Sequence, residues 1–267
     1  MGILDSLSNA SVAAWSLRKL RSAYAGYACR IQRSSDNATQ DIGFSGTDFD
    51  TTSAASFVGA SNAVVAIWYD QSGNGYNLTP SGTGPTLYTS GTLKTAGTNS
   101  KASPSFSSNQ MVTGFSVTMS DPYNMTVAGL MNATSLSGYP RFFSLGASGD
   151  TDYQTTKGGI LSSGGSNLIW QSTYYSLGPS SFATGALKNI GIVHKSLEGD
   201  VYVNSSATLN GVAFPSGANT GMALGGSYSG GGQCTALIPE WVVFNAILSS
   251  TDRNAIFSDQ QTYYGTS

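Results

Sequence analysis

The side chains best suited to chemistry in this sequence are its carboxylates, and one of them lies in the unusual stretch WYDQSGNG, residues 68–75. Cleavage of a glycosidic bond needs two carboxylic acids that flank the bond, about 5–5.5 Å apart in retaining enzymes and farther apart in inverting ones. One of the two must be held protonated near neutral pH by an apolar site or by its neighbours. The chain has only two glutamates, Glu198 and Glu240, so most candidates for such a pair are aspartates.

Neither glutamate has the sequence context of a catalytic acid. Glu198 lies in a Leu-Glu-Gly turn, where exposure would keep it ionised, and Glu240 precedes the apolar run WVVFN, where we expect it to accept backbone N–H bonds. Asp70 has no second carboxylate near it in the sequence. Six further aspartates stand in turn or cap contexts, where Asp is common for structural reasons: Asp36, Asp121, Asp150, Asp152, Asp200 and Asp252. We therefore predict no catalytic residue.

Other kinds of site find equally little support. The lone histidine, His194, ends a strand-like run, and no G-x-S-x-G motif accompanies it, so serine-hydrolase chemistry is not indicated. Cys29 and Cys234 lack the spacing of a zinc site; we expect two buried thiols, and a single bridge between them stays open. Two loose groups of aspartates lack the spacing of a calcium loop, namely Asp41, Asp48 and Asp50, and Asp150 with Asp152. We predict no cofactor and no metal, with calcium as an unsupported alternative.

The composition argues against several classes of protein. Charged residues make up 10% of the 267, against ~25% in typical soluble proteins, while 40% are apolar and 11% aromatic, enough for a core. The formal net charge is −2, and the only basic cluster is Arg18, Lys19 and Arg21, which we expect on the solvated face of a helix rather than on nucleic acid. No apolar run approaches the ~20 residues of a membrane span, and the first 15 residues lack the pattern of a signal peptide.

Two helices are predicted near the ends of the chain, at 11–24 and 250–265. Ser11 and Ser250 could cap their starts, and Gly265 would end the second helix. In the first segment, apolar residues recur with the spacing of a helix.

Between these helices, short strand-like runs are separated by Gly, Asn, Asp and Ser. This pattern is typical of a β-sandwich or jelly roll. The run AVVAIWY, 63–69, is continuous and rich in β-branched and aromatic residues, so it is predicted to be a buried strand. We predict one domain over 1–267, in which the helical segment 1–26 could anchor the protein or contact another copy.

Each residue of the stretch WYDQSGNG can be given a structural task. Trp68 and Tyr69 close the buried strand and point to opposite faces of it. Asp70 can accept N–H bonds from the turn that follows. Asn74 and Gly75 tolerate positive φ and let the chain reverse. We therefore interpret the stretch as a rigid strand end rather than an active site.

The C-terminal half resembles the concanavalin A-like (laminin G-like) jelly roll. The matching features are the hairpin LKNIGIVHKSLEGDVYVNSSAT, 187–208, the Gly-Gly strand GMALGG, and ALIPEWVVFNAIL followed by a last helix. This resemblance implies an all-β, concanavalin A-like jelly-roll β-sandwich with a short N-terminal helix and a C-terminal helix. It says little about function, because one fold carries many functions.

The first 80 residues resemble the start of the catalytic domain of fungal-type α-L-arabinofuranosidase B, glycoside hydrolase family 54. The resemblance is carried by the Val-Ala-Ala opening, Ser-x-Tyr-x-Gly, the Arg-x-Ser-Asp turn and Tyr-Asp-Gln-Ser-Gly-x-Gly. The same module is similar to parts of many phage virion proteins. The sequence departs from the hydrolase family in two ways. It lacks the family's vicinal cysteine pair, and it has Val58 where the family has a cysteine. No position could be matched to the family's catalytic acid or nucleophile.

These departures favour a non-catalytic bacteriophage virion protein, such as a tail or head fibre, spike or decoration protein, that binds host cell-surface glycans. Its expected location is the virion, and its expected partners are other virion proteins, host polysaccharide and further copies of itself in a homo-oligomer. The residues predicted to contact a glycan are Tyr76, Asn77, Tyr153, Trp170, Tyr174 and Tyr175. Two alternatives remain: a purely structural protein that cements a capsid or assembles a fibre, and an arabinofuranosidase-like hydrolase.

Overall fold

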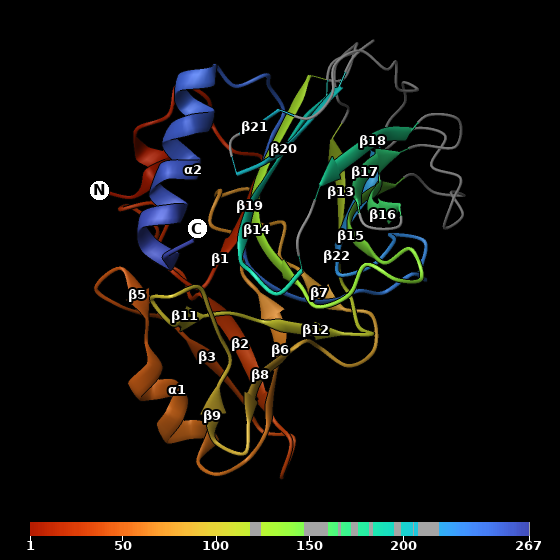
Figure 1. Cartoon of the computed structure of the whole chain (residues 1–267). Coiled ribbons are helices and arrows are strands. Elements are labelled where there is room, and N and C mark those ends of the chain that lie inside the picture. The colour runs from red at the N-terminus through yellow and green to blue at the C-terminus, as the bar shows by residue number, and fades with distance from the viewer. Residues whose placement is uncertain are drawn as a thin grey trace.

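The computed structural model describes residues 1–117, 124–146, 160–164, 167–171, 176–181, 184–194, 199–204, 206–207 and 219–266. The core of the structure is formed by two large antiparallel sheets, parts of which face each other in the upper part of Figure 1. The larger sheet has the order β21 (Ser206–Ala207), β20 (Gly199–Val203), β19 (Lys188–His194), β14 (Met125–Ala133), β23 (Thr235–Phe244), β12 (Ser105–Ser107), β8 (Thr86–Thr89), β6 (Ala63–Trp68), β2 (Cys29–Arg33), β3 (Thr39–Ile42); β1 (Ala13–Ser16) also pairs with β23, and β9 (Thr92–Leu93) with β8.

The smaller sheet faces the β14–β19–β20 part of the larger one (Figure 1). Its order is β18 (Ser176–Ser181), β17 (Asn167–Gln171), β16 (Ile160–Gly164), β15 (Arg141–Gly146), β22 (Asn219–Leu224), β13 (Met111–Val117), β7 (Thr79–Pro80). Two short hairpins pair β10 (Thr95–Ala96) with β11 (Lys101–Ala102) and β4 (Phe44–Ser45) with β5 (Asp48–Phe49). The helices are a 3₁₀ turn η1 (Ile3–Asp5), α1 (Thr51–Val58) and α2 (Ser250–Tyr264).

Alternation along β23 builds the core of the sandwich. Trp241 and Val243 belong to the main core between the sheets, whereas Val242 and Phe244 belong to a second cluster on the outer side, where α2 supplies Phe257. Across the main core, the rings of Phe143 and Trp241 approach to 5.3 Å between centroids. Figure 1 shows α2 lying along this outer side of the larger sheet. The prediction of an all-β jelly-roll sandwich with a C-terminal helix is confirmed.

The predicted helix at 11–24 is wrong, because its middle forms strand β1. Ala13–Ser16 pairs antiparallel with Glu240–Val243 of β23. Ala14 packs in the outer cluster and Trp15 in the main core, so neighbouring side chains point to opposite faces as in any strand. The apolar residues whose spacing suggested one helix face are therefore divided between the main core and the outer cluster. Pairing with a strand more than 200 positions away overrides the local propensity.

Helix α2 follows the predicted bounds closely. The Oγ of Ser249, one residue before the predicted cap Ser250, accepts a hydrogen bond of 3.0 Å from the backbone N–H of Asp252. Gly265 ends the helix with φ of 67°. Helix α1 was not predicted; it begins where the Oδ1 of Asp50 accepts a bond of 3.0 Å from the N–H of Ser53. In the described part of the chain, no helix is long and apolar enough to cross a membrane.

Candidate functional site

The carboxylate of Asp70 is buried and fully used by the turn around it. Its Oδ1 accepts hydrogen bonds of 2.8 Å from the backbone N–H groups of Ala14 and Ser72, and its Oδ2 accepts from the hydroxyl of Ser72 at 2.6 Å and the N–H of Tyr76 at 3.0 Å. The carboxylate therefore joins the turn to β1. This geometry suits the predicted structural role and leaves no oxygen free for a substrate.

The neighbouring Gln71 ties the N-terminal segment to the same turn. Its Oε1 accepts from the backbone N–H of Leu20 at 2.8 Å, and its Nε2 donates to the carbonyls of Ser16 and Arg18 at 2.9 and 2.8 Å. Gln71 is fully buried. Sequence reasoning gave it no role, because nothing local marks a glutamine whose partners lie more than 50 positions away.

Glu240 forms a buried ion pair with Arg18 on the side of the larger sheet that α2 covers. Its Oε2 accepts from the Nε of Arg18 at 2.7 Å and the hydroxyl of Ser16 at 2.9 Å; its Oε1 accepts from the Nη2 of Arg18 at 3.0 Å and the Nε2 of Gln260 at 3.1 Å. These partners are side chains, not the backbone N–H groups that we expected. Arg18, which we expected in solvent, is 6% exposed. The sequence placed it on a helix face that does not form.

The electrostatics of this pair make it a poor proton donor. Burial alone would lower the pKa of Arg18, but the attraction and hydrogen bonds of Glu240 outweigh that effect, so the pKa is raised. Burial and the charge of Glu240 also raise the pKa of Tyr264, which lies beside the pair. The geometry is that of a structural ion pair whose carboxylate oxygens are already taken by hydrogen bonds.

Five more carboxylates in the described part of the chain have lowered pKa values and are held ionised by hydrogen bonds. These are Asp5 with Ser22, Asp36 with Arg33, Asp41 with Arg30, Asp48 with Tyr263 and Asp50 with Ser53. A general acid for glycoside cleavage needs the opposite shift. None of these five therefore qualifies as the protonated partner of a catalytic pair.

Four acids lie outside the described residues, and each belongs to a connection that leaves the same end of the sandwich. We call this the distal end and define it by five strand termini, Val117, Met125, Gly146, His194 and Gly199. Met125 pairs with His194, and His194 with Gly199; in the other sheet, Gly146 pairs with the third residue of β22. Along the chain, Asp121 follows β13, Asp150 and Asp152 follow β15, and Glu198 follows β19.

Tyr228 lies against the smaller sheet at the distal end. A Cβ on Gly146 or Gly221 would come within 2.7 or 2.0 Å of its ring, so both strands leave room for the ring. The backbone N–H of Tyr228 donates to the hydroxyl of Ser144 at 2.7 Å. The side chain is half-buried. Sequence reasoning gave Tyr228 no role. The signal in the sequence was one glycine in each of two strand-like runs, Gly146 and Gly221, and the structure shows that neither needs a positive φ angle.

Of the predicted glycan-binding residues that the structure describes, Tyr76 and Asn77 lie near one edge of the smaller sheet and Trp170 near the other. The backbone oxygen of Tyr76 accepts from the indole of Trp15 at 2.8 Å, and the Oδ1 of Asn77 accepts from the N–H of Asp70 at 2.9 Å. Both lie near β7, which pairs with the first residues of β13. The last residue of β13 belongs to the distal end, so Tyr76 and Asn77 lie at the opposite end of that strand. Trp170 lies in β17 opposite Leu161. Tyr153, Tyr174 and Tyr175 lie outside the described residues.

His194 and the cysteines have no nucleophilic character in this structure. Burial lowers the pKa of His194 to about 4, so its imidazole is neutral at pH 7. Cys29 and Cys234 are free and buried, and burial raises the pKa of both thiols. The bridge that the sequence left open is therefore not formed. Among the residues that the structure describes, no group of three or more His, Cys, Asp or Glu side chains is arranged to hold a metal ion.

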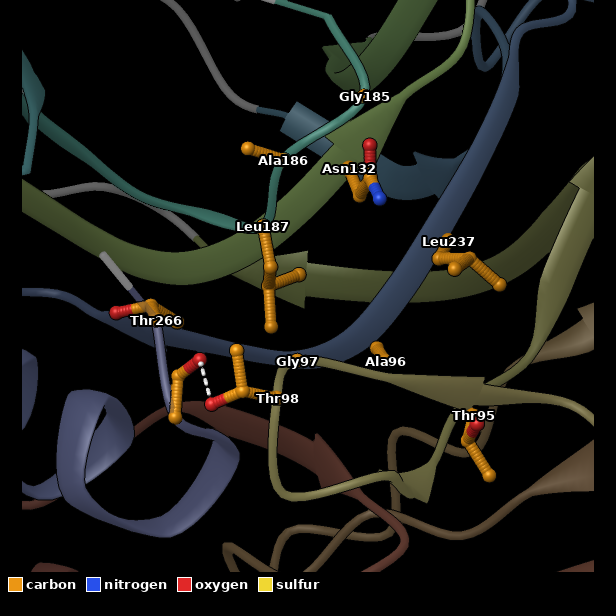
Figure 2. Close-up of a pocket in the computed structure, with 11 residues that line it drawn as sticks. Thr95, Ala96, Gly97, Thr98, Asn132, Gly185, Ala186, Leu187, Leu237 and Thr266 are labelled. Atoms are coloured by element: carbon orange, nitrogen blue, oxygen red, sulfur yellow. Dashed lines mark hydrogen bonds between the residues drawn. The ribbon is translucent and has the colours of Figure 1, made fainter.

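A pocket of about 340 Å³ lies at the other end of the sandwich, between the β10 hairpin, the end of α2 and the last residues of β14 (Figure 2). In the described part of the chain, no Asp or Glu lines it, so those residues offer no pair of carboxylates for acid–base cleavage of a glycoside. The carboxylates that could perform such cleavage must therefore be sought elsewhere in the molecule.

Comparison with known proteins identifies the family. Residues 3–137 match the family model described as Alpha-L-arabinofuranosidase B, catalytic. The chain belongs to this family. A search of curated proteins found no match.

Solved arabinofuranosidases of glycoside hydrolase family 54 share the fold. A mutant soaked with 4-nitrophenyl α-L-arabinofuranoside superposes with a TM-score of 0.80 at 16% identity, covering 99% of this chain and 66% of that one. A complex with arabinofuranosyl-α-1,2-xylobiose gives 0.76 at 16% identity, covering 99% and 65%. Trypanosoma rangeli sialidase in complex with sialic acid gives 0.54 at 13% identity, covering 74% of this chain and 32% of that one. The chain thus spans just under two thirds of the length of the arabinofuranosidases it resembles.

These findings correct the functional prediction. The proposal of a non-catalytic bacteriophage virion protein is wrong, because the family model that matches is that of a catalytic domain and the structures that match along 99% of the chain are arabinofuranosidases. The prediction that the protein is not an enzyme is wrong for the same reason. The error came from giving more weight to a missing cysteine pair and unplaced acids than to the motifs shared with the hydrolase family.

Proposed function

We propose that this protein is a glycoside hydrolase that releases terminal α-L-arabinofuranosyl groups. The match of residues 3–137 to the arabinofuranosidase B catalytic family carries the proposal. The similarity of fold along 99% of the chain to arabinofuranosidases studied with arabinofuranosyl compounds supports it. The predicted homo-oligomer and the predicted lack of a cofactor stay predictions.

The catalytic carboxylates of such an enzyme would be drawn from the acids of the distal-end connections. Asp70 and Glu240 are buried in structural hydrogen bonds, and the five surface acids described above have lowered pKa values. Three more described acids also have structural positions: Asp200 accepts from the hydroxyl of Tyr202, Asp252 lies in the first turn of α2, and Asp259 pairs with Arg18. The remaining acids are Asp121, Asp150, Asp152 and Glu198, which follow strands that end together. One would protonate the leaving oxygen, and a second would attack the anomeric carbon or activate water.

Tyr228 would support the bound sugar. Its ring packs against two glycines, its backbone N–H donates to the hydroxyl of Ser144, and it lies at the end of the sandwich to which these acids are connected. The C–H groups of a furanose ring pack well on an aromatic face. We therefore assign Tyr228 a binding role and not a chemical one.

Release of 4-nitrophenol from 4-nitrophenyl α-L-arabinofuranoside tests the proposal. The substitutions Asp121→Asn, Asp150→Asn, Asp152→Asn and Glu198→Gln are made singly, with Asp36→Asn as the control, because Asp36 lies on the surface in a pair with Arg33. We expect two of the four to lower kcat about 10²–10⁴-fold, the usual effect of losing a general acid or base, and the control to retain activity. A wild-type protein that releases no nitrophenol would refute the function, and full activity in all four variants would refute the assignment of the acids.

A further inference from the structure

The pocket in Figure 2 is built from segments that hydrogen bonds hold in place. Both the hydroxyl and the backbone N–H of Thr98 donate to the carbonyl of Gly265, at 2.9 and 3.0 Å, which fixes the β10 hairpin against the end of α2. On the opposite wall, the N–H of Gly185 donates to the carbonyl of Ala133 at 3.1 Å. The pocket is therefore preformed, as ligand sites usually are.

The lining combines neutral polar groups with an aliphatic wall. Thr95, Thr98, Asn132 and Thr266 contribute hydroxyls and an amide, and Leu187 and Leu237 contribute apolar surface. Among the described residues, no charged side chain lines the pocket. An ionic ligand would lose hydration here without gaining a counter-charge, so the lining favours an uncharged ligand with several hydroxyl groups.

Asn132 supplies an acceptor that the protein itself leaves unused. The register between β14 and β23 shifts between Leu130 and Asn132, a bulge of the kind that redirects a side chain. The Oδ1 of Asn132 is buried and has no hydrogen-bond partner among the described residues. A buried acceptor without a donor is costly. The Oδ1 itself has almost no accessible surface, so a ligand hydroxyl reaches it when the Asn132 amide turns toward the pocket that it lines.

We propose that this pocket binds a single neutral monosaccharide. Its volume, about 340 Å³, is at the lower end of the ~300–1,000 Å³ typical of small-molecule sites, which suits one sugar ring and not a chain. The pocket lies roughly 20 Å along β14 from the distal end, taking 3.3 Å for each residue between Met125 and Asn132. It is thus separate from the hydrolytic site proposed above, and the proposal does not require that the protein cleave glycosides.

Titration of the ¹⁵N-labelled protein with L-arabinose, followed by amide chemical shifts, tests binding directly. We expect saturable shifts at the amides of Thr98, Gly185 and Thr266, and no such shifts with D-glucuronate, a sugar that carries a carboxylate. Shifts confined to other parts of the molecule, no shifts at all, or equal binding of glucuronate would overturn the proposal. Because arabinose is not a substrate for hydrolysis, the result is independent of catalytic activity.

Two matched variants connect the binding to Asn132. Asn132→Leu keeps the size of the side chain but removes its amide, and we expect it to weaken arabinose binding by about tenfold, the effect of losing one hydrogen bond. Asn254→Leu changes an exposed asparagine on α2 and should leave binding unchanged. Equal affinity in the wild type and Asn132→Leu would refute the role of Asn132. The wild-type titration localises the site even if that variant folds poorly.

Discussion

The ion pair between Arg18 and Glu240 joins residues 222 positions apart and fixes the N-terminal segment to β23. Both side chains are almost fully buried, and each carboxylate oxygen accepts at least two hydrogen bonds. A buried pair of this kind contributes little net stability compared with apolar packing, but breaking it leaves an uncompensated charge in the protein. Its main effect is to select one position for the N-terminal segment.

Arg18→Met should therefore lower the free energy of unfolding by about 3–5 kcal/mol, because Glu240 would stay buried without its partner. Urea denaturation measures the change. Arg33→Met removes an arginine from an exposed pair with Asp36 and should change stability little, since solvent screens that pair. Equal losses in the two variants would contradict the special role of the buried pair.

His194 should make the protein sensitive to mild acid. Burial lowers its pKa from 6.5 to about 4, so below pH 6.5 the unfolded chain binds a proton that the folded protein excludes. Stability should then fall as the pH drops from 6.5 to 4, by roughly 3 kcal/mol at most. Thermal unfolding at a series of pH values measures this, and His194→Gln should flatten the curve over that window. Asp36→Asn should not, because the lowered pKa of Asp36 places its titration below pH 4.

Strands β15 and β22 each carry a glycine whose missing side chain makes room for the ring of Tyr228. Neither Gly146 nor Gly221 has a positive φ angle, so the backbone does not require glycine there. The loop that follows β22 then folds back, with the N–H of Cys234 donating to the carbonyl of Gly225 at 2.9 Å. The two strands and the loop together place one aromatic ring at the distal end.

Gly221→Ala should displace that ring, because the new Cβ would lie 2.0 Å from it. We expect a changed near-ultraviolet circular dichroism spectrum and a severalfold higher KM for the arabinofuranoside with little change in kcat. Gly43→Ala is the control, since a Cβ there meets only the ring of Tyr27 at an ordinary 3.7 Å. An unchanged spectrum and KM in Gly221→Ala would show that the ring does not occupy this place.

The whole molecule consists of a sandwich whose strand termini gather at the distal end and an N-terminal part in which β2, β3, β6 and β8 extend the larger sheet (Figure 1). Cys29 in β2 and Cys234 before β23 belong to one continuous core that spans both parts. Both thiols have 0% exposure. Because the core encloses them, their reactivity reports on the integrity of the entire fold.

The native protein should react with no equivalents of a thiol reagent such as DTNB, and the protein unfolded in guanidinium should react with two. A reducing agent should leave the melting temperature unchanged, because no bridge exists to be broken. Reaction of a thiol in the native state would contradict the burial of the cysteines. An unfolded chain with no reactive thiol would instead reveal a disulfide.

The sequence by itself determined features whose cause is local: helix α2 with its caps, the buried strand β6, the turn held by Asp70, and the motifs of the arabinofuranosidase family. Capping, turn chemistry and alternation act over a few residues and can be read from the chain directly. Only the tertiary structure decided that Ala13–Ser16 is a strand, that Arg18 is buried on Glu240 and that Tyr228 rests on two glycines. Each of these features depends on a partner distant in the chain. The free energy gained by burial and strand pairing with that partner exceeds the local preferences of the sequence.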